Sequence, residues 1–238
     1  MRKNPRTVRK MSRIIFDIET IGADFDALDL PQQEYLLKYA ETEEEAEAVK
    51  ESLGLYPLTG EIVTIGLMNP DTLKGVIYFQ APGKGLSPFE EDGVQYETGT
   101  EKEILEKFWD VIKSYNQFVT FNGRAFDCPF ILIRSAMHKL RPTRELMPNR
   151  YNGPHIDLLD QLTFYGATRR RFSLDMWCRS LGIKSPKDEG IAGQDVKRFF
   201  QEGHYTDIAR YCARDLLATR ELLLRWENYV KFNPGPAS

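Results

Sequence analysis

The sequence predicts a mixed α/β fold, with a central sheet of antiparallel and parallel strands flanked by helices. Two observations lead to this prediction: three strand-like segments joined by turns come first, and helix-like and strand-like segments then alternate. The chain has 238 residues, of which 42% are hydrophobic, and this is enough for a sizeable core. Its formal net charge of -3 is too small to indicate a partner, so partners have to be inferred from local patterns.

The first half of the predicted sheet is an antiparallel meander of three strands. They are expected at "RIIFDIET", "EIVTIGLMN" and "GVIYFQA", because each segment is rich in β-branched and aromatic residues. Turn-like segments, "PLTG" and "PDTLKG", precede the second and third strands. An acidic, helix-favouring stretch from about Leu30 to Leu53 lies after the first strand, and we interpret it as an insertion at about residues 24–56. The segment "APGKGLSPFEEDG" after the third strand is expected to be a loop.

The second half alternates helices and strands. Apolar residues recur at helical spacing, and Pro129 and Ser173 occupy positions typical of helix starts. The expected elements are a helix at 100–115, a strand at 117–123, a helix from near Asp127, a strand and helix around 155–164, a short helix after Ser173 and a long helix from about Thr206 to Val230. We expect a single domain over residues 13–232, between a basic tail (1–12) and a C-terminal tail (233–238).

The composition also limits the cellular setting. The three cysteines, Cys128, Cys178 and Cys212, are far apart and form no C-x-x-C pair, so neither a disulfide framework nor a zinc site is predicted. The basic N-terminus lacks the apolar run of a signal peptide, and no stretch approaches the length of a membrane span. We therefore expect a cytoplasmic protein with no membrane partner.

Two acids interrupt the first predicted strand. Side chains alternate across a strand, so Asp17 and Glu19 project side by side from one face, while Ile14, Phe16 and Ile18 share the other. The carboxylates repel each other and lose hydration if they are buried, so something must compensate them. A buried ion pair or an edge strand is the alternative explanation.

Two more acids occupy unusual positions. Asp215 falls in the middle of the apolar stripe of the last predicted helix, with Tyr211 one turn before it. Asp127 stands at the junction of a strand and a helix. The alternatives are a salt bridge from a facing arginine to Asp215 and a helix N-cap role for Asp127.

Together these four carboxylates predict a metal site. They can converge only if something positive lies between them, and oxygen ligands without paired Cys or His select a hard cation, Mg²⁺ or Mn²⁺. Two such ions are held when one carboxylate bridges them. Paired hard cations are the usual means of directing water in line at a phosphodiester.

At this point the residues resemble a known family, the DEDD 3′-5′ exonucleases with the ribonuclease H-like fold. "FDIET" is similar to their first motif, D-x-E, and "FNGRAFDCPFI" to the second, N-x4-D. "YCARD" is similar to the third motif in its tyrosine form, Y-x3-D (DEDDy). A second branch of the family has His five residues before the last Asp, and Arg210 occupies that position here. The resemblance covers nearly the whole chain and is closest to stand-alone exonucleases related to the proofreading domain of family B DNA polymerases, where a "PLTG"-type turn also occurs.

The resemblance implies a role for each motif residue. Asp17 bridges two metal ions, Mg²⁺ or Mn²⁺, while Glu19 and Asp215 hold the ion that carries the nucleophilic water. Asp127 supports the second ion, through water, and Tyr211 orients the attacking water. Contacts to the terminal nucleotide are implied for Thr20, Ile21, Asn122 and Phe126.

Other polar and aromatic residues have two readings each. Arg169, Arg170 and Arg171 lie in a loop-like stretch and are predicted to contact backbone phosphates, with a solvated surface as the alternative. Phe16, Phe126 and Tyr211 are candidates for stacking on a terminal base, although a core position is favoured for Phe16. Structural or surface roles are expected for the three histidines, His138, His155 and His204. Surface or capping roles are expected for Asp157 and Asp160, with support of the metal-binding acids as the alternative.

The leading hypothesis is a metal-dependent 3′-5′ exonuclease that acts on single-stranded nucleic acid, DNA favoured, and releases nucleoside 5′-monophosphates. One alternative is an exoribonuclease with the same mechanism, and another is a non-catalytic nucleic-acid-binding module with this fold. The expected partners are the 3′ ends of single-stranded DNA or RNA. A role in DNA repair, with a polymerase or repair protein acting in trans, is also considered, but the sequence does not specify that protein.

Overall fold

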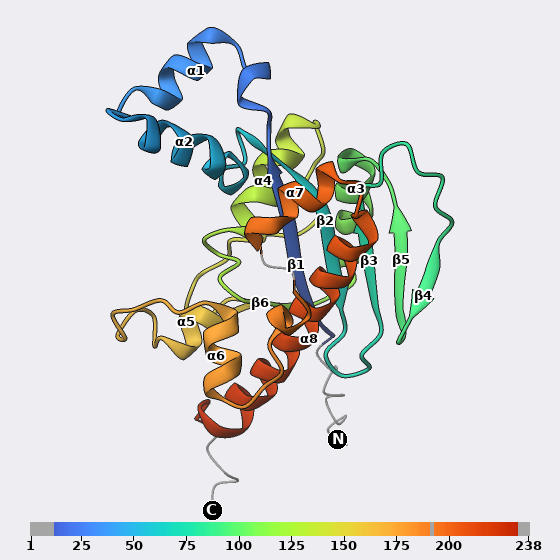
Figure 1. The fold of residues 1–238 in the computed structure, drawn as a ribbon. Coiled ribbons are helices and arrows are strands. Elements are labelled where there is room, and N and C mark those ends of the chain that lie inside the picture. The colour runs from blue at the N-terminus through green and yellow to red at the C-terminus, as the bar shows by residue number, and fades with distance from the viewer. Residues whose placement is uncertain (1–11, 191–192, 233–238) are drawn as a thin grey trace, which may run out of the picture.

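The structure is a computed structural model that describes residues 12–190 and 193–232. These residues form a seven-stranded sheet in the order β4-β5-β3-β2-β1-β6-β7 (Figure 1). The strands are β1 (Arg13–Gly22), β2 (Gly60–Met68), β3 (Gly75–Phe79), β4 (Phe89–Glu91), β5 (Val94–Thr98), β6 (Gln117–Thr120) and β7 (His155–Asp157). As predicted, β1, β2 and β3 are an antiparallel meander, and β6 and β7 run parallel to β1. The mixed sheet confirms the predicted fold class.

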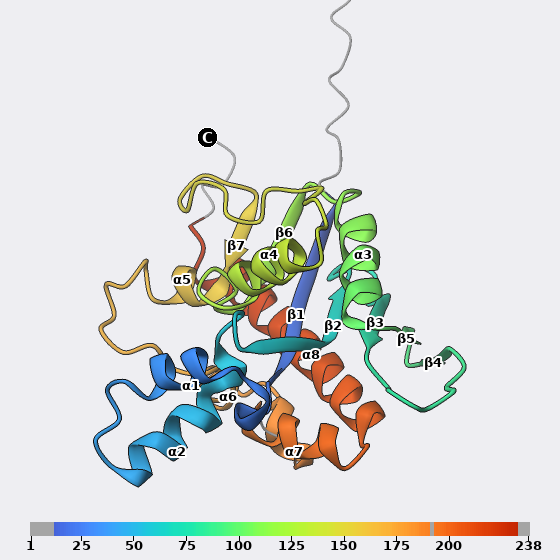
Figure 2. The ribbon, with the colours of Figure 1, turned by 90° about the horizontal axis from the view of Figure 1, so that it is seen from above.

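Helices cover both faces of the sheet (Figure 2). One face carries α3 (Glu101–Ile112) and α4 (Asp127–Met137), and the other carries α8 (Tyr205–Tyr229) with the shorter α5 (Leu158–Leu162) and α6 (Leu174–Ser180). The side chains of β1 divide between two cores in the predicted way: Ile14, Phe16 and Ile18 are buried with α3 and α4, and Ile15 is buried with α8. Among the described residues, no helix is long and apolar enough to cross a membrane.

The predicted loop "APGKGLSPFEEDG" was wrong in its second half. There β4 pairs with β5 in an antiparallel hairpin whose turn residues, Asp92 and Gly93, both have positive φ values, 51° and 79°. An Asp-Gly pair is a strong hairpin signal because both positions of a type I′ turn need this conformation. Phe89 stacks on Tyr96 across the hairpin, with ring centroids 4.7 Å apart. The hairpin extends the sheet by two strands beyond the meander.

The acidic stretch forms two helices, α1 (Leu30–Leu37) and α2 (Glu43–Glu51), which project from the body of the protein (Figure 1). Each begins at a residue that caps it: Asp29 forms a capping box and Thr42 accepts from the Glu45 amide. Neither helix contains a buried residue, so the projection is held by short 3-10 segments, Phe25–Ala27 and Ser52–Leu55, at its base. That it is an insertion stays a prediction. The proposed tails lie outside the described residues, apart from Ser12.

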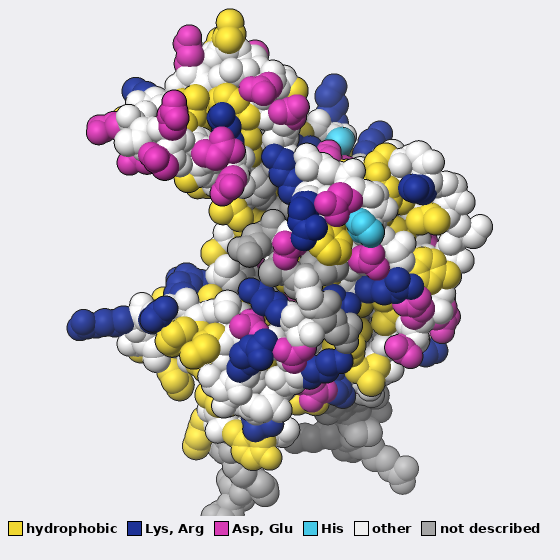
Figure 3. All heavy atoms as spheres, in the orientation of Figure 1, with side chains coloured by type: hydrophobic (Ala, Val, Ile, Leu, Met, Phe, Trp, Pro, Cys, Tyr) yellow, Lys and Arg dark blue, Asp and Glu magenta, His cyan; other side chains and the backbone are white. Residues whose placement is uncertain are grey.

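One half of β1 has a free edge. Its ladder with β6 joins Arg13–Ile15 to Gln117–Val119 and goes no further in the described pairing. Beyond that point, β1 is paired only with β2, and a register shift between Glu19 and Thr20 bends it. Figure 3 shows the surface hollowed between the α1–α2 projection and the segment that joins α5 to α6. The acids of β1 lie along this open stretch of the strand.

Candidate active site

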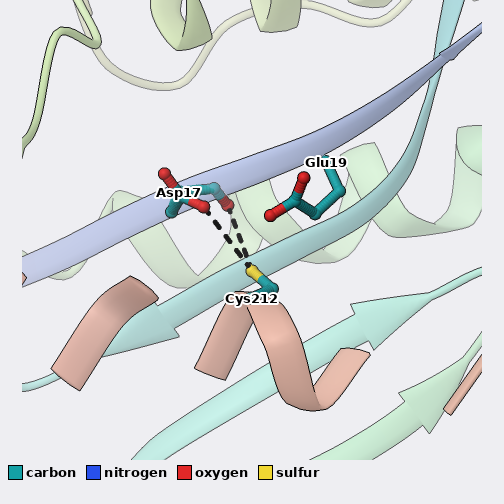
Figure 4. Close-up of side chains that lie close together, drawn as sticks. All are labelled: Asp17, Glu19 and Cys212. Carbon is teal, nitrogen blue, oxygen red and sulfur yellow. Dashed lines mark hydrogen bonds between the residues drawn. The ribbon is translucent and has the colours of Figure 1, made fainter. Parts of the chain in front are cut away.

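The first two acids lie side by side on the face of β1 that α8 covers. Glu19 is 7% exposed and Asp17 is half-buried. Cys212 reaches toward them from α8, and one ligand atom from each of these three residues lies within 4.8 Å of the other two (Figure 4). The Cys212 thiol donates to the backbone oxygen and to Oδ2 of Asp17, with 3.9 Å in each case.

A glycine on the neighbouring strand lets α8 approach this closely. Gly66 of β2 pairs with Asp17 across the antiparallel ladder. A Cβ atom at Gly66 would lie 2.7 Å from Cys212 Sγ and 2.8 Å from Leu216 Cδ1, which is closer than such atoms can pack. The absence of a side chain at Gly66 therefore sets the distance between α8 and the acids.

The other two acids reach the same place from separate helices. Asp127 is the first residue of α4, and its Oδ1 accepts a hydrogen bond of 3.1 Å from the Ile18 amide on the free edge of β1. Asp215 lies on α8, where the Tyr211 hydroxyl one turn earlier donates to its carboxylate. Both acids are buried, at 3% and 7% exposure. The structure therefore brings together the five residues predicted to be catalytic.

The site carries a concentration of negative charge. Burial is the main cause that raises the pKa of all four carboxyl groups, to about 7 for Asp127 and Asp215, and repulsion among the acids adds to the rise for Asp17 and Glu19. Lys187 and Arg214 lower the pKa of Asp215. Among the described residues, however, no Lys or Arg forms a salt bridge with any of the four acids.

The ion-pair alternatives for these acids are not seen among the described residues: no arginine is paired with Asp215, and neither Asp17 nor Glu19 forms an ion pair. The edge-strand alternative holds in part, because β1 is an interior strand whose second half has a ladder partner on one side only in the described pairing. The N-cap position of α4 is Phe126, without a side-chain cap, so Asp127 binds a neighbouring strand instead of its own helix start. Three buried carboxylates and the half-buried Asp17, beside an open strand edge, are a donor set that suits hard divalent cations.

Comparison with known proteins identifies the family. A family model described as a predicted 3′-5′ exonuclease related to the exonuclease domain of PolB matches residues 88–231, which is more than half of the chain. The chain belongs to this family.

Two archaeal DNA polymerases are similar to part of this chain in sequence, and a solved polymerase structure is similar in fold. DNA polymerase 1 of Saccharolobus solfataricus is 35% identical over 75 residues, which are 31% of this chain and 8% of the polymerase. DNA polymerase 1 of Sulfolobus acidocaldarius is 30% identical over 82 residues, which are 34% of this chain and 9% of that polymerase. The chain therefore spans only a small part of these relatives. The structure of the family B DNA polymerase from Pyrobaculum calidifontis superposes on this chain with a TM-score of 0.58 and 13% sequence identity. The match covers 91% of this chain and 24% of the polymerase chain, and it shows a shared fold.

The PolB-related exonuclease family match includes Asp127, Tyr211 and Asp215 but begins after β1. Asp17 and Glu19 are joined to these residues by the geometry described above. Arg210 lies five residues before Asp215, and its guanidinium binds Glu91 of β4 instead of the acids. It donates two hydrogen bonds to Glu91, at 2.9 and 2.6 Å. Arg210 therefore fastens α8 to the β4–β5 hairpin.

The turn before Asp127 is held by an acid whose role was only partly predicted. Asp157, 1% exposed at the end of β7, caps α5 through the Leu159 amide, as predicted. It also accepts from the amides of Asn122 and Arg124, at 2.9 Å each. These bonds fix Asn122 in a left-handed conformation, with φ of 64°, and thereby position the turn. The surface or capping role expected for Asp160 was wrong, because Asp160 is buried, caps none of the described helices and accepts two hydrogen bonds from the Arg150 guanidinium.

The residues predicted to contact the terminal nucleotide occupy different environments. The Thr20 hydroxyl donates to the Gly54 carbonyl at 2.7 Å, and Ile21 is buried in a small cluster against α8. Phe126 is partly buried, with its ring 5.5 Å from that of Phe130. Asn122 accepts a 2.7 Å hydrogen bond from Arg171, so the predicted phosphate-binding arginines adjoin the turn before Asp127. Their substrate contacts stay a prediction.

The remaining candidates are structural. Phe16 is fully buried in the core, on the face of β1 away from the acids, so it is not available for stacking. His155 is buried, and burial lowers its pKa to about 3, so it is neutral while bound to Thr120 at 2.8 Å. His138 pairs with Glu101 and His204 with Asp207. These positions agree with the structural or surface roles expected for the histidines.

Proposed function

We propose that this protein is a metal-dependent 3′-5′ exonuclease that shortens single-stranded nucleic acid from its 3′ end, with DNA favoured. One observation carries the proposal: four carboxylates converge on the free edge of β1, and no cationic side chain of the described residues pairs with them. Such an arrangement is costly for the fold alone, and it is suited to a site that binds divalent cations. The match to a predicted 3′-5′ exonuclease family supports the same chemistry.

The donor set fits two ions of Mg²⁺ or Mn²⁺. Asp17, Glu19, Asp127 and Asp215 would hold them. When bound, such ions activate a water molecule and stabilise the leaving oxygen. In the reaction, the water oxygen bonds to phosphorus while the bond from phosphorus to the 3′ oxygen breaks, leaving a shortened strand with a free 3′ hydroxyl and a nucleoside 5′-monophosphate.

The chain's own residues position the reactants. Tyr211 donates to Asp215, and its hydroxyl would orient the attacking water. Asn122 and Phe126 both lie in the turn that precedes α4, where the Phe126 amide donates to the Asn122 carbonyl, and they would hold the terminal nucleotide beside Asp127. The hollow at the free edge of β1 would admit a single strand.

DNA is favoured as the substrate because the relatives are DNA polymerases. The test is degradation of 5′-labelled oligonucleotides of one sequence, as single-stranded DNA, duplex DNA and RNA, with Mg²⁺ or Mn²⁺ and with EDTA. We expect a metal-dependent ladder that grows from full length downward, fastest on single-stranded DNA.

The other outcomes distinguish the alternatives. Faster shortening of RNA would identify an exoribonuclease, which must accommodate the 2′-hydroxyl. Binding without shortening, with metal shown to be bound, would identify a non-catalytic nucleic-acid-binding module and contradict the proposal.

A further inference from the structure

The segment between α5 and α6 has an unusual backbone. Phe164, Tyr165 and Gly166 are consecutive residues in the left-handed region, with φ values of 50°, 56° and 95°. This conformation is unfavourable for residues that carry a Cβ atom, and it persists only where the surroundings impose it. Here the imposing contacts are hydrogen bonds from the Tyr165 amide to the Asp160 carbonyl, 2.7 Å, and from the Thr168 amide to the Thr163 carbonyl, 3.1 Å.

The closed turn holds an aromatic ring in solvent. Phe164 is 60% exposed, although a phenylalanine in a loop is easily turned inward. Tyr165, the next residue, is anchored against the ring of Tyr151 at 4.8 Å and to the Gln161 amide at 2.8 Å. Phe164 therefore presents an exposed ring beside an anchored neighbour, and an exposed aromatic ring can stack on a nucleic-acid base.

Positive charge follows directly after this ring. No acidic residue occurs between Asp160 and Asp175, and the segment contains Arg169, Arg170 and Arg171, all exposed. Arg170 lies over the ring of Phe172 at 5.0 Å. Among the described residues, Arg169 and Arg170 form no ion pair, so their charges are available to a ligand. Arg171 is bound to Asn122, which joins the segment to the active-site turn.

The opposite side of the hollow has the opposite charge. The first turn of α2 alone contains Glu43, Glu44 and Glu45, and Figure 3 shows acidic side chains over the α1–α2 projection. On the other side of the hollow, Figure 3 shows arginine or lysine side chains on the segment that joins α5 to α6. A nucleic-acid backbone is repelled by the first wall and attracted by the second. A strand whose 3′ end lies at the acids of β1 therefore leaves along the segment between α5 and α6.

We propose that residues Phe164–Phe172 bind the unpaired nucleotides just upstream of the terminal one. One base stacks on Phe164, while Arg169 and Arg170 contact backbone phosphates. The combination of exposed aromatic rings and arginines is the usual means of binding single strands without sequence preference. This inference rests on the proposed function, since that function places the 3′ end at the acids.

The test measures the Kd of the full chain for a labelled single-stranded oligonucleotide by fluorescence anisotropy. The buffer contains Ca²⁺ in place of Mg²⁺ or Mn²⁺, and a gel run afterwards checks that the oligonucleotide has kept its length during the measurement. Phe164→Ala is expected to weaken binding at least about fivefold, and Phe164→Trp to restore it, because the loss is that of a base–aromatic stack. The control is Tyr39→Ala, which removes a more exposed ring, 82% against 60% for Phe164, from the acidic projection and should leave binding unchanged.

The arginines are tested by salt dependence. Replacing Arg169 and Arg170 together by serine is expected to reduce the slope of log Kd against log salt by about 1.4, roughly 0.7 for each phosphate contact to a single strand. The control pair is Lys113→Ser, at the C-cap of α3, with Arg225→Ser, near the end of α8. Both side chains are exposed, and their replacement should leave the slope unchanged. No binding by the unaltered chain, or equal binding by test and control variants, would overturn the inference.

Failure of this inference is separable from failure of the proposed function. Hydrolysis that is unaffected by Phe164→Ala would contradict the upstream site alone. Binding that depends on Phe164 without any hydrolysis would support the site and contradict the exonuclease.

Discussion

Two buried acidic sites in this protein differ in how their charge is balanced. Glu101, 5% exposed at the start of α3, accepts from Arg134 at 2.8 and 2.5 Å, from His138 at 2.7 Å and from the Ile62 amide at 2.8 Å. Burial raises its pKa, but these bonds outweigh burial and the pKa is lowered. The four acids around β1 have no such cations, and their pKa values are raised.

The difference distinguishes a structural acid from a functional one. A buried carboxylate surrounded by donors is part of the fold, and removing it leaves the partner cations unpaired. Buried carboxylates that face one another weaken the fold unless something positive is added. The two sites should therefore respond in opposite ways to neutralisation.

The largest effect is expected for Asp17→Asn. Activity on single-stranded DNA should fall on the order of 10²- to 10³-fold, because removing one group of a preorganised electrostatic site costs about this much in rate. In EDTA, the melting temperature should be unchanged or raised, since like-charge repulsion is relieved. The measurement pairs a degradation assay with thermal unfolding. A marked drop in melting temperature would support the ion-pair interpretation of Asp17 instead.

Glu101→Gln should show the reverse pattern. The free energy of unfolding should fall by about 3 kcal/mol, because Arg134 is left as a buried, unpaired charge. Activity should be retained at a temperature where both proteins are folded. Chemical denaturation and the degradation assay measure the two quantities. Loss of activity without loss of stability would mean that Glu101 takes part in the chemistry.

Tyr211→Phe refines the comparison within the acid cluster. It keeps the buried ring and removes only the hydroxyl, so stability should change little. The turnover rate should fall on the order of 10²-fold if the hydroxyl orients the attacking water. Single-turnover kinetics at saturating metal measure this rate. An unchanged rate would limit Tyr211 to packing.

A smaller effect concerns pH. Because the pKa of Glu101 is lowered in the folded state, its contribution to stability is full above the unfolded pKa of about 4.3 and is lost as pH falls through the folded value. The groups that face it are Arg134, His138 and Glu61. The difference in unfolding free energy between the unaltered chain and Glu101→Gln should therefore stay constant above about pH 5 and shrink as pH falls below about 4.3. A constant difference would contradict the assignment.

Local pattern predicted the elements of the site, and non-local contacts account for what it missed. Alternation along β1 placed Asp17 and Glu19 on one face, and helical periodicity placed Asp215 beside Tyr211. The partners of Asp157 come from a turn more than 30 residues away, and Arg171 reaches Asn122 across 49 residues. Neither spacing has a periodic signal. The β4–β5 hairpin was different, because its Asp-Gly turn was visible in the sequence.

The central claim is that the four acids around β1 bind divalent cations and Glu101 does not. Titration with Mn²⁺, followed by the loss of the paramagnetic resonance signal of the free ion, measures this directly. We predict binding by the unaltered chain and by Glu101→Gln, and strongly weakened binding by Asp17→Asn. Equal binding by Asp17→Asn and the unaltered chain, or no binding by either, would contradict the account.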